Sequence, residues 1–184
     1  MCKNQWDYWD AIHLAIRMAE CKIDPVSVCC DFEKALINAV QEQFRRVPII
    51  GCLFHWKQTI RRRMISKLKM NEDQVRAAMA PNMLDTLTII PRDEILTKGI
   101  AYVKEQLKAH VTTEEDKSLW NDFWNGYFIK FWCSSEEFIA TWNINDGGDY
   151  YDVHNRTNNV IERYLILYNF MIFNFNNMFS CFCC

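Results

Sequence analysis

Residues 26–58 read VSVCCDFEKALINAVQEQFRRVPIIGCLFHWKQ, and their pattern predicts a strand, a helix and a second strand in succession. Residues 26–30 are a short apolar run of β-prone character, and Asp31 stands where that predicted strand ends. Residues 47–54 are a second apolar run, which brings Cys52 and His55 to its far end as a Cys-x-x-His turn. Between the runs, apolar residues recur at the spacing of an amphipathic helix: Phe32, Ala35, Leu36, Ala39, Val40 and Phe44.

Both predicted strands therefore end in side chains that can take part in chemistry. In an open α/β sheet, reactive groups gather at the carboxyl ends of the strands. Asp31 occupies one such end, and the pair Cys52 and His55 occupies the other. We expect a functional site at this edge of the sheet.

Two motifs resemble the catalytic domain of Mutator-like (MULE) DNA transposases. The first joins Asp31-Phe32-Glu33 to residues 51–58, GCLFHWKQ, and the second is residues 156–164, RTNNVIERY, which include Glu162. The two motifs are in the family's order, a long helix-rich stretch separates them, and the resemblance reaches about Tyr164. It implies an α/β fold with a partial RNase H-like core and a large α-helical insertion at about 71–155. By residue count such a domain, spanning 1–163, is mostly α.

The resemblance also implies an activity, metal-dependent cleavage and transfer of DNA strands. Such enzymes commonly hold two divalent metal ions with a few carboxylates, one ion at the attacking oxygen and one at the leaving oxygen. Asp31 matches the family's second catalytic acid and Glu162 matches its third, so both are expected to bind Mg²⁺ or Mn²⁺. The first acid belongs on a strand before the opening helix, and residues 1–5 cannot supply it. We expect a fragment with its first strands missing and without transposition activity.

Simpler roles compete with each of these assignments. An Asp between a strand and a helix is most often a helix N-cap, and Glu162 alone would be an ordinary helical surface residue. The paired motifs favour the metal-binding role for both. Cys52 and His55 have metal-ligand spacing, but a structural zinc site needs four ligands, and the sequence has no second close pair. We expect them to shape the floor of the active site, without zinc.

Basic residues crowd into the stretch that follows the Cys-x-x-His motif. They could contact DNA phosphates, and DNA with transposon ends is the partner that the resemblance implies; a homo-oligomer also stays open. The competing interpretation is a solvated face of a basic helix at 58–69. The residues assigned to DNA binding are Lys57, Arg61, Arg62 and Arg63.

The composition suits a single domain of 184 residues with a substantial core. The formal net charge is only -2, so bulk charge does not indicate nucleic-acid binding. The nine cysteines are expected to be reduced in the nucleus or cytoplasm, because the chain opens with a polar segment and no signal peptide. Four tryptophans could stack on unpaired bases, but their helical spacing favours the core: Trp120, Trp124, Trp132 and Trp142.

The rest of the chain predicts helices. One covers 6–20, one or two short helices cover 72–90 with a break at Pro81, and one runs from Pro91 to about 109. Thr112 or Thr113 is expected to cap an aromatic-rich helix. Residues 143–155 are expected to be a loop, after which Thr157 caps the helix that carries Glu162.

Residues 164–184, YLILYNFMIFNFNNMFSCFCC, carry no charge and show no amphipathic period. We interpret them as an atypical tail outside the domain, from translated noncoding sequence or a degenerate element. An uncharged stretch of about 20 residues could also span a membrane, but its four asparagines argue against a membrane partner. Two alternatives for the whole chain follow: a remnant, non-enzymatic module that binds DNA or proteins, and a tail-anchored membrane protein.

Overall fold

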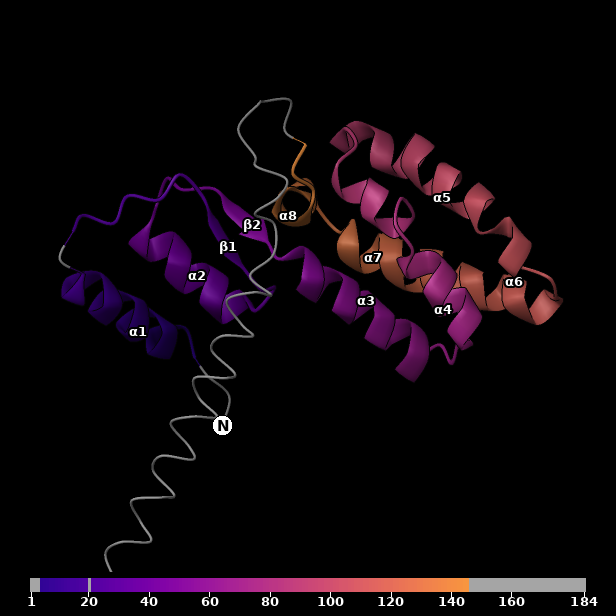
Figure 1. Cartoon of the computed structure of the whole chain (residues 1–184), viewed down its shortest axis with the longest axis horizontal. Coiled ribbons are helices and arrows are strands. Elements are labelled where there is room, and N and C mark those ends of the chain that lie inside the picture. Colours follow the sequence, from indigo (N-terminus) through magenta and orange to yellow (C-terminus); the bar gives the residue numbers. More distant parts are fainter. Residues whose placement is uncertain (1–3, 20, 146–184) are drawn as a thin grey trace, which may run out of the picture.

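The computed structural model describes residues 4–19 and 21–145 of the chain. Over these ranges the chain is mostly helical, and its two short strands lie with α1 and α2 in one half of an elongated arrangement (Figure 1). The expected helix carrying Glu162, most of the loop 143–155 and the tail 164–184 lie outside the described residues. Among the described helices, none has the length and apolar character needed to cross a membrane.

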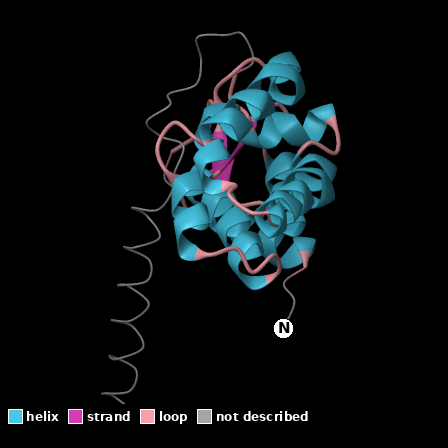
Figure 2. Cartoon of the chain, turned by 90° about the vertical axis from the view of Figure 1, so that its right-hand side faces the viewer, coloured by secondary structure: helices cyan, strands magenta, loops and turns pink. Residues whose placement is uncertain are grey.

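The predicted strand–helix–strand unit is present. Strand β1 (Val28–Cys30) pairs in parallel with β2 (Ile49–Gly51), and helix α2 (Lys34–Gln43) connects them. Val28 lies opposite Ile49, and the Cys52 amide donates to the Cys30 carbonyl at 2.8 Å, which extends the ladder by one bond. Figure 2 shows the two strands side by side among the helices. The structure thus supports a mostly helical chain with one parallel strand pair.

The second apolar run is shorter as a strand than the sequence predicts. Strand β2 ends at Gly51, and Leu53 begins helix α3 (Leu53–Ser66), so Cys52 is the helix N-cap and His55 lies in the first helical turn. The expected turn after a long strand is therefore wrong. Its physical reason is the spacing of Trp56, Ile60 and Met64, which places all three buried side chains on one face of a helix.

Helix α1 (Gln5–Met18) packs against α2, and its start and end agree with the predicted helix within two residues. Asn4 and Asp7 form a reciprocal capping box that begins the helix. Hydrogen bonds fix the contact between the helices: the Gln5 side-chain amide donates to Glu42 at 3.0 Å, and the Tyr8 hydroxyl donates to Glu33 at 2.6 Å. No residue of α1 is fully buried.

The remaining described chain is a layer of helices that begins with α3. As predicted, Thr113 caps one of them, and Pro81 separates two others. The bounds are α4 (Glu72–Met79), η1 (Leu84–Thr88), η2 (Arg92–Glu94), η3 (Ile95–Gly99), α5 (Ile100–Gln106), η4 (Lys108–His110), α6 (Glu114–Asn121), η5 (Asp122–Phe128), α7 (Ile129–Trp132) and α8 (Glu136–Trp142).

Two of these segments, η3 and η5, have the wider turns of a π-helix inside otherwise continuous helices. Four aromatic residues of η5 are buried in the core: Phe123, Trp124, Tyr127 and Phe128. Helix α8 follows a cap by Ser135, which accepts from the Phe138 amide, and the acidic residues Glu136 and Glu137 favour its first turn. The sequence interpretation assigned no element to these residues.

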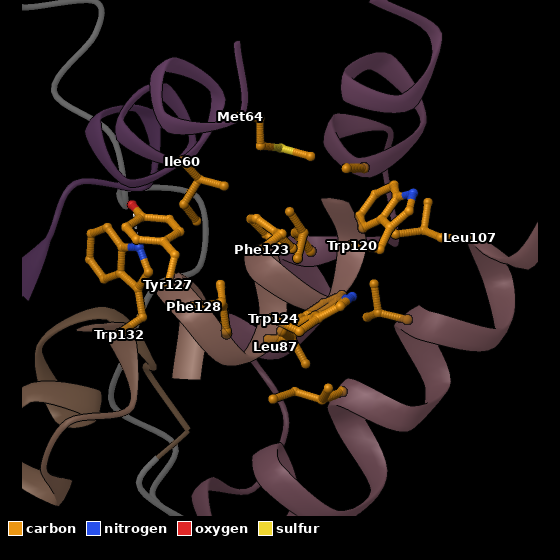
Figure 3. Close-up of a cluster of buried hydrophobic side chains, with 14 of the residues drawn as sticks. Ile60, Met64, Leu87, Leu107, Trp120, Phe123, Trp124, Tyr127, Phe128 and Trp132 are labelled. Atoms are coloured by element: carbon orange, nitrogen blue, oxygen red, sulfur yellow. Dashed lines mark hydrogen bonds between the residues drawn. The ribbon is translucent and has the colours of Figure 1, made fainter. Parts of the chain in front are cut away.

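The core is an aromatic cluster centred on Trp56 of α3, part of which Figure 3 shows. The Trp56 ring stacks on Trp142 at 5.6 Å between centroids and meets Trp132 edge-on at 5.9 Å. Phe32 meets Trp132 at 5.1 Å, so the cluster also joins the strand unit to the helical layer. All four tryptophans expected in the core are buried: Trp120, Trp124, Trp132 and Trp142.

Asn143 closes the end of the described helical layer. Its buried side-chain amide donates to the carbonyls of Leu87 and Ile90, both at 2.9 Å. The Ile144 amide donates to the Thr88 carbonyl at 3.0 Å. These bonds join the residues after α8 to η1 and satisfy polar groups that would be costly to bury alone.

The tight approach of β2 to its neighbours predicts the effect of a single methyl group. In Gly51→Ala, the added Cβ would overlap the Phe32 ring and approach the Thr141 carbonyl oxygen at 2.8 Å. Because the backbone of α8 cannot yield as a side chain can, we expect a loss of about 1–3 kcal/mol in the free energy of unfolding. Urea denaturation followed by circular dichroism measures it.

Gly126→Ala is the matched control. Its added Cβ meets only the Asp122 Cβ, at 3.9 Å, and the residue lies within a helical segment. We expect this variant to be neutral or slightly stabilised. Equal destabilisation of the two variants would contradict the close packing of β2 against α8.

Candidate functional site

Asp31 lies at the carboxyl end of β1, at the same end of the strand pair as Cys52. Cys30 is aligned with Gly51, so the next residue on each strand, Asp31 or Cys52, extends from the same sheet edge. The Asp31 side chain is half-buried. The structure therefore brings together the acid and the cysteine that the sequence placed at neighbouring strand ends.

Asp31 is not the N-cap of the following helix. Helix α2 begins at Lys34 with Glu33 as its N-cap, and no side chain caps that end. Instead, Asp31 Oδ1 accepts a hydrogen bond from the Glu33 amide at 3.0 Å, in the short turn between strand and helix. This bond orients the carboxylate, and an ionised carboxylate can accept at its second oxygen as well.

A second acidic group lies beside Asp31. The Tyr8 hydroxyl, from α1, donates to Glu33 Oε2 at 2.6 Å. This hydrogen bond to Glu33 is the main cause that raises the pKa of Tyr8 to about 12; burial and the negative charges of Glu33, Asp31 and Asp7 add to it. The sequence interpretation missed Tyr8, because nothing local links a helix residue to an acid so far along the chain.

The strand end also carries two buried cysteines, Cys30 and Cys52. Burial, with added contributions from nearby Asp31 and Cys52, raises the pKa of the Cys30 thiol to about 12. A neutral thiol here is a small apolar group that packs under the strand end. This position is compatible with the predicted role of Cys52 in shaping the floor of the site, and that role stays a prediction.

His55 lies one helical turn after Cys52, half-buried on α3. Its ring meets the Phe54 ring edge-on at 5.5 Å. The described residues contain no cluster of three or more His, Cys, Asp or Glu side chains that could hold a metal ion. Glu162, the expected partner of Asp31 in metal binding, lies outside the described residues, so the expectations on zinc and magnesium stay predictions.

The four basic residues assigned to DNA binding fall into two groups on α3. Arg61 and Arg62 are exposed to solvent. Lys57 instead forms an ion pair with Asp85 of η1 at 3.1 Å, with each side chain only about a quarter exposed (27% and 25%). Arg63 lies over the Tyr127 ring, 5.0 Å from its centroid, where a cation is attracted to the aromatic face.

Lys57 and Arg63 therefore have partners within the fold that the sequence pattern could not reveal. Asp85 and Tyr127 lie in distant segments, and only the folded chain brings them to α3. The available cationic surface of this helix is accordingly formed by Arg61 and Arg62, with exposed Lys67 and Lys69 just beyond.

No family model, curated protein or solved structure matches this chain.

The burial of Cys30 predicts a strong contrast in reactivity with Cys21, which is exposed. With a pKa of about 12, only about one Cys30 thiol in 10⁴ is ionised at pH 8, and the thiolate is the reactive form. We expect iodoacetamide to modify Cys21 rapidly and Cys30 only after unfolding. Peptide mass spectrometry over a time course, with and without urea, checks this. Equal rates at both residues in the native protein would contradict the buried strand end.

Proposed function

We propose that this chain is part of a Mutator-like DNA transposase catalytic domain with a partial RNase H-like core. The observation that carries the proposal is the position of Asp31: a half-buried carboxylate at the carboxyl end of a parallel strand, held by the Glu33 amide. It supports a metal-binding role over a capping role, because the following helix does not use Asp31 as its cap.

In the proposed site, Asp31 and Glu162 hold a divalent metal ion. A carboxylate offers the hard oxygen that Mg²⁺ and Mn²⁺ prefer, so the chemistry of Asp31 fits this role. Bound metal would stabilise negative charge on the reacting DNA oxygens.

The two matched motifs supply two of the family's three catalytic acids, Asp31 and Glu162, and Asp7 and Asp10 lie on helix α1. In this proposal the chain does not transfer DNA strands by itself. With two of three acids, the metal is held weakly and the two-metal arrangement is incomplete.

A second candidate function is a non-enzymatic module that binds DNA. The exposed side chains of Arg61 and Arg62, next to Lys67 and Lys69, favour it. Such a surface needs no complete catalytic triad, because phosphate binding depends on charge alone. The membrane-anchored alternative depends on residues 164–184 and has no support from the described residues.

The metal site predicts a shared effect of two distant acids. Asp31→Asn and Glu162→Gln should each weaken Mn²⁺ binding by at least about tenfold, as loss of even an outer-shell partner costs 10–100-fold. Because both hold one ion, the double variant should lose little more than either single variant. Electron paramagnetic resonance of free Mn²⁺ measures the affinity.

Glu33→Gln is the matched control for this experiment, since Glu33 already accepts from Tyr8 and should affect affinity little. If the losses of Mn²⁺ binding free energy in Asp31→Asn and Glu162→Gln add up in the double variant, the two acids belong to different sites and the proposal is wrong. The same preparations should not nick DNA in Mg²⁺ or Mn²⁺. Cleavage that Asp31→Asn abolishes would show that another acid completes the site.

The split of the basic residues predicts which of them contact DNA. Arg62→Ala should reduce the slope of log affinity against log salt concentration by about one, the loss of one phosphate contact. Lys57→Ala should leave the slope unchanged and lower stability instead, because Asp85 then lacks its cation. Fluorescence anisotropy with a short duplex measures the slope. Lys98→Ala, an exposed lysine on η3, is the control; an equal effect there would indicate binding without a defined surface.

A further inference from the structure

Helix α1 carries a row of exposed apolar side chains on the side turned away from α2. Trp6, Leu14 and Met18 are 63%, 60% and 74% exposed, and the exposed acid Asp10 stands between the first two. The four residues follow one another at intervals of four positions, so they form a single ridge along the helix. Large apolar side chains exposed in one row indicate an interaction surface.

This ridge cannot turn inward without breaking the contact with α2. Gln5 and Tyr8, on the opposite side of α1, are fixed by hydrogen bonds to Glu42 and Glu33. Their positions leave the ridge facing outward. A partner is therefore needed to remove these side chains from water.

A groove of matching character lies between α3 and α4. Its cavity volume is about 790 Å³, and Figure 1 shows the two helices side by side at a distance from α1. Most of its lining residues are apolar, and Arg61 of α3 and Arg76 of α4 are exposed members of the lining. The lining includes Ile65, Val75 and Met79 and the charged residues Arg61, Glu72 and Arg76.

We propose that α1 of one copy of this chain binds in the α3–α4 groove of another copy. Trp6, Leu14 and Met18 would contact the apolar lining, and Asp10 would lie near Arg61 and Arg76. The ridge from Trp6 to Met18 is about 18 Å long at 1.5 Å per residue, and the groove that receives it runs from Arg61 and Ile65 of α3 along the eight residues of α4 to Pro81. Helix-in-groove binding of this kind uses one apolar helix face.

Charge supports this occupant. Among the residues that line the groove, Arg61 and Arg76 are basic and Glu72 is acidic, and Arg76 also forms an ion pair with Asp73. The ridge of α1 carries Asp10 at its centre and Asp7 beside it. An apolar lining gains nothing from a DNA phosphate, whereas Ile65, which is 43% exposed, would be covered by an apolar helix face.

Each copy would then carry both halves of the contact. Such an interface is heterologous, so it joins copies head to tail unless two copies close on each other. A variant with a disrupted ridge and a variant with a disrupted groove should therefore each fail to self-associate. When the two are mixed, the intact ridge of one can still bind the intact groove of the other.

The test is sedimentation velocity of purified chain over a concentration series. Leu14→Glu places a charge in the ridge, and Ile65→Glu places a charge in the groove. Each variant should lower the self-association constant more than about tenfold, because the charge enters an apolar contact. A mixture of the two should form a one-to-one complex and nothing larger. Leu96→Glu, an exposed apolar residue of η3 outside both surfaces, should associate as the unmodified chain does.

Circular dichroism and thermal unfolding confirm that the variants are folded; all three substitutions are at exposed positions. Arg61→Glu should also weaken association, and adding Asp10→Arg to the same chain should restore it. A chain that stays monomeric at every concentration overturns the proposal, as does a mixture of Leu14→Glu and Ile65→Glu that fails to associate. Loss of DNA binding in Ile65→Glu with self-association intact would assign the groove to nucleic acid and also overturn it.

Discussion

The burial of Trp56 in a shell of aromatic rings is the interaction on which the rest of the structure depends. Trp56 belongs to α3, the helix that leaves the strand pair and enters the helical layer. Its stacking on Trp142 and its edge contact with Trp132 tie the first and last parts of that layer together. Because Phe32 reaches the same cluster, the position of the strand unit is set by this core.

The sequence predicts most of the fold where periodicity is local. The parallel strand unit, the buried tryptophans and the cap at Thr113 follow from spacing and end signals. The sequence predicts too long a strand at β2, because apolar Leu53 and Phe54 suit a strand as well as a helix. Only the spacing of Trp56 and Ile60 farther along indicates that a helix has begun. The π-turns of η3 and η5 leave no signal in residue spacing.

The candidate site could be predicted only in part. The ends of the two strands can be recognised in the sequence, which therefore predicts that Asp31 and Cys52 lie close together. Contacts between distant segments were not: Tyr8 with Glu33, Lys57 with Asp85, and Arg63 with Tyr127. These contacts change the interpretation of the four basic residues assigned to DNA binding, because Lys57 and Arg63 already interact with other residues of the fold.

The parallel pairing of β1 and β2 has a consequence for the order of folding. Helices of the α3–α8 layer that are neighbours in the chain make local contacts, which form quickly, whereas the Trp56–Trp142 contact and the contact of β2 with α8 join residues far apart in the chain. The strands can pair only after α2 has crossed over, and β2 must then fit under α8 at Gly51. Docking of the strand pair would therefore be a late step, so damage there should speed unfolding more than it slows folding.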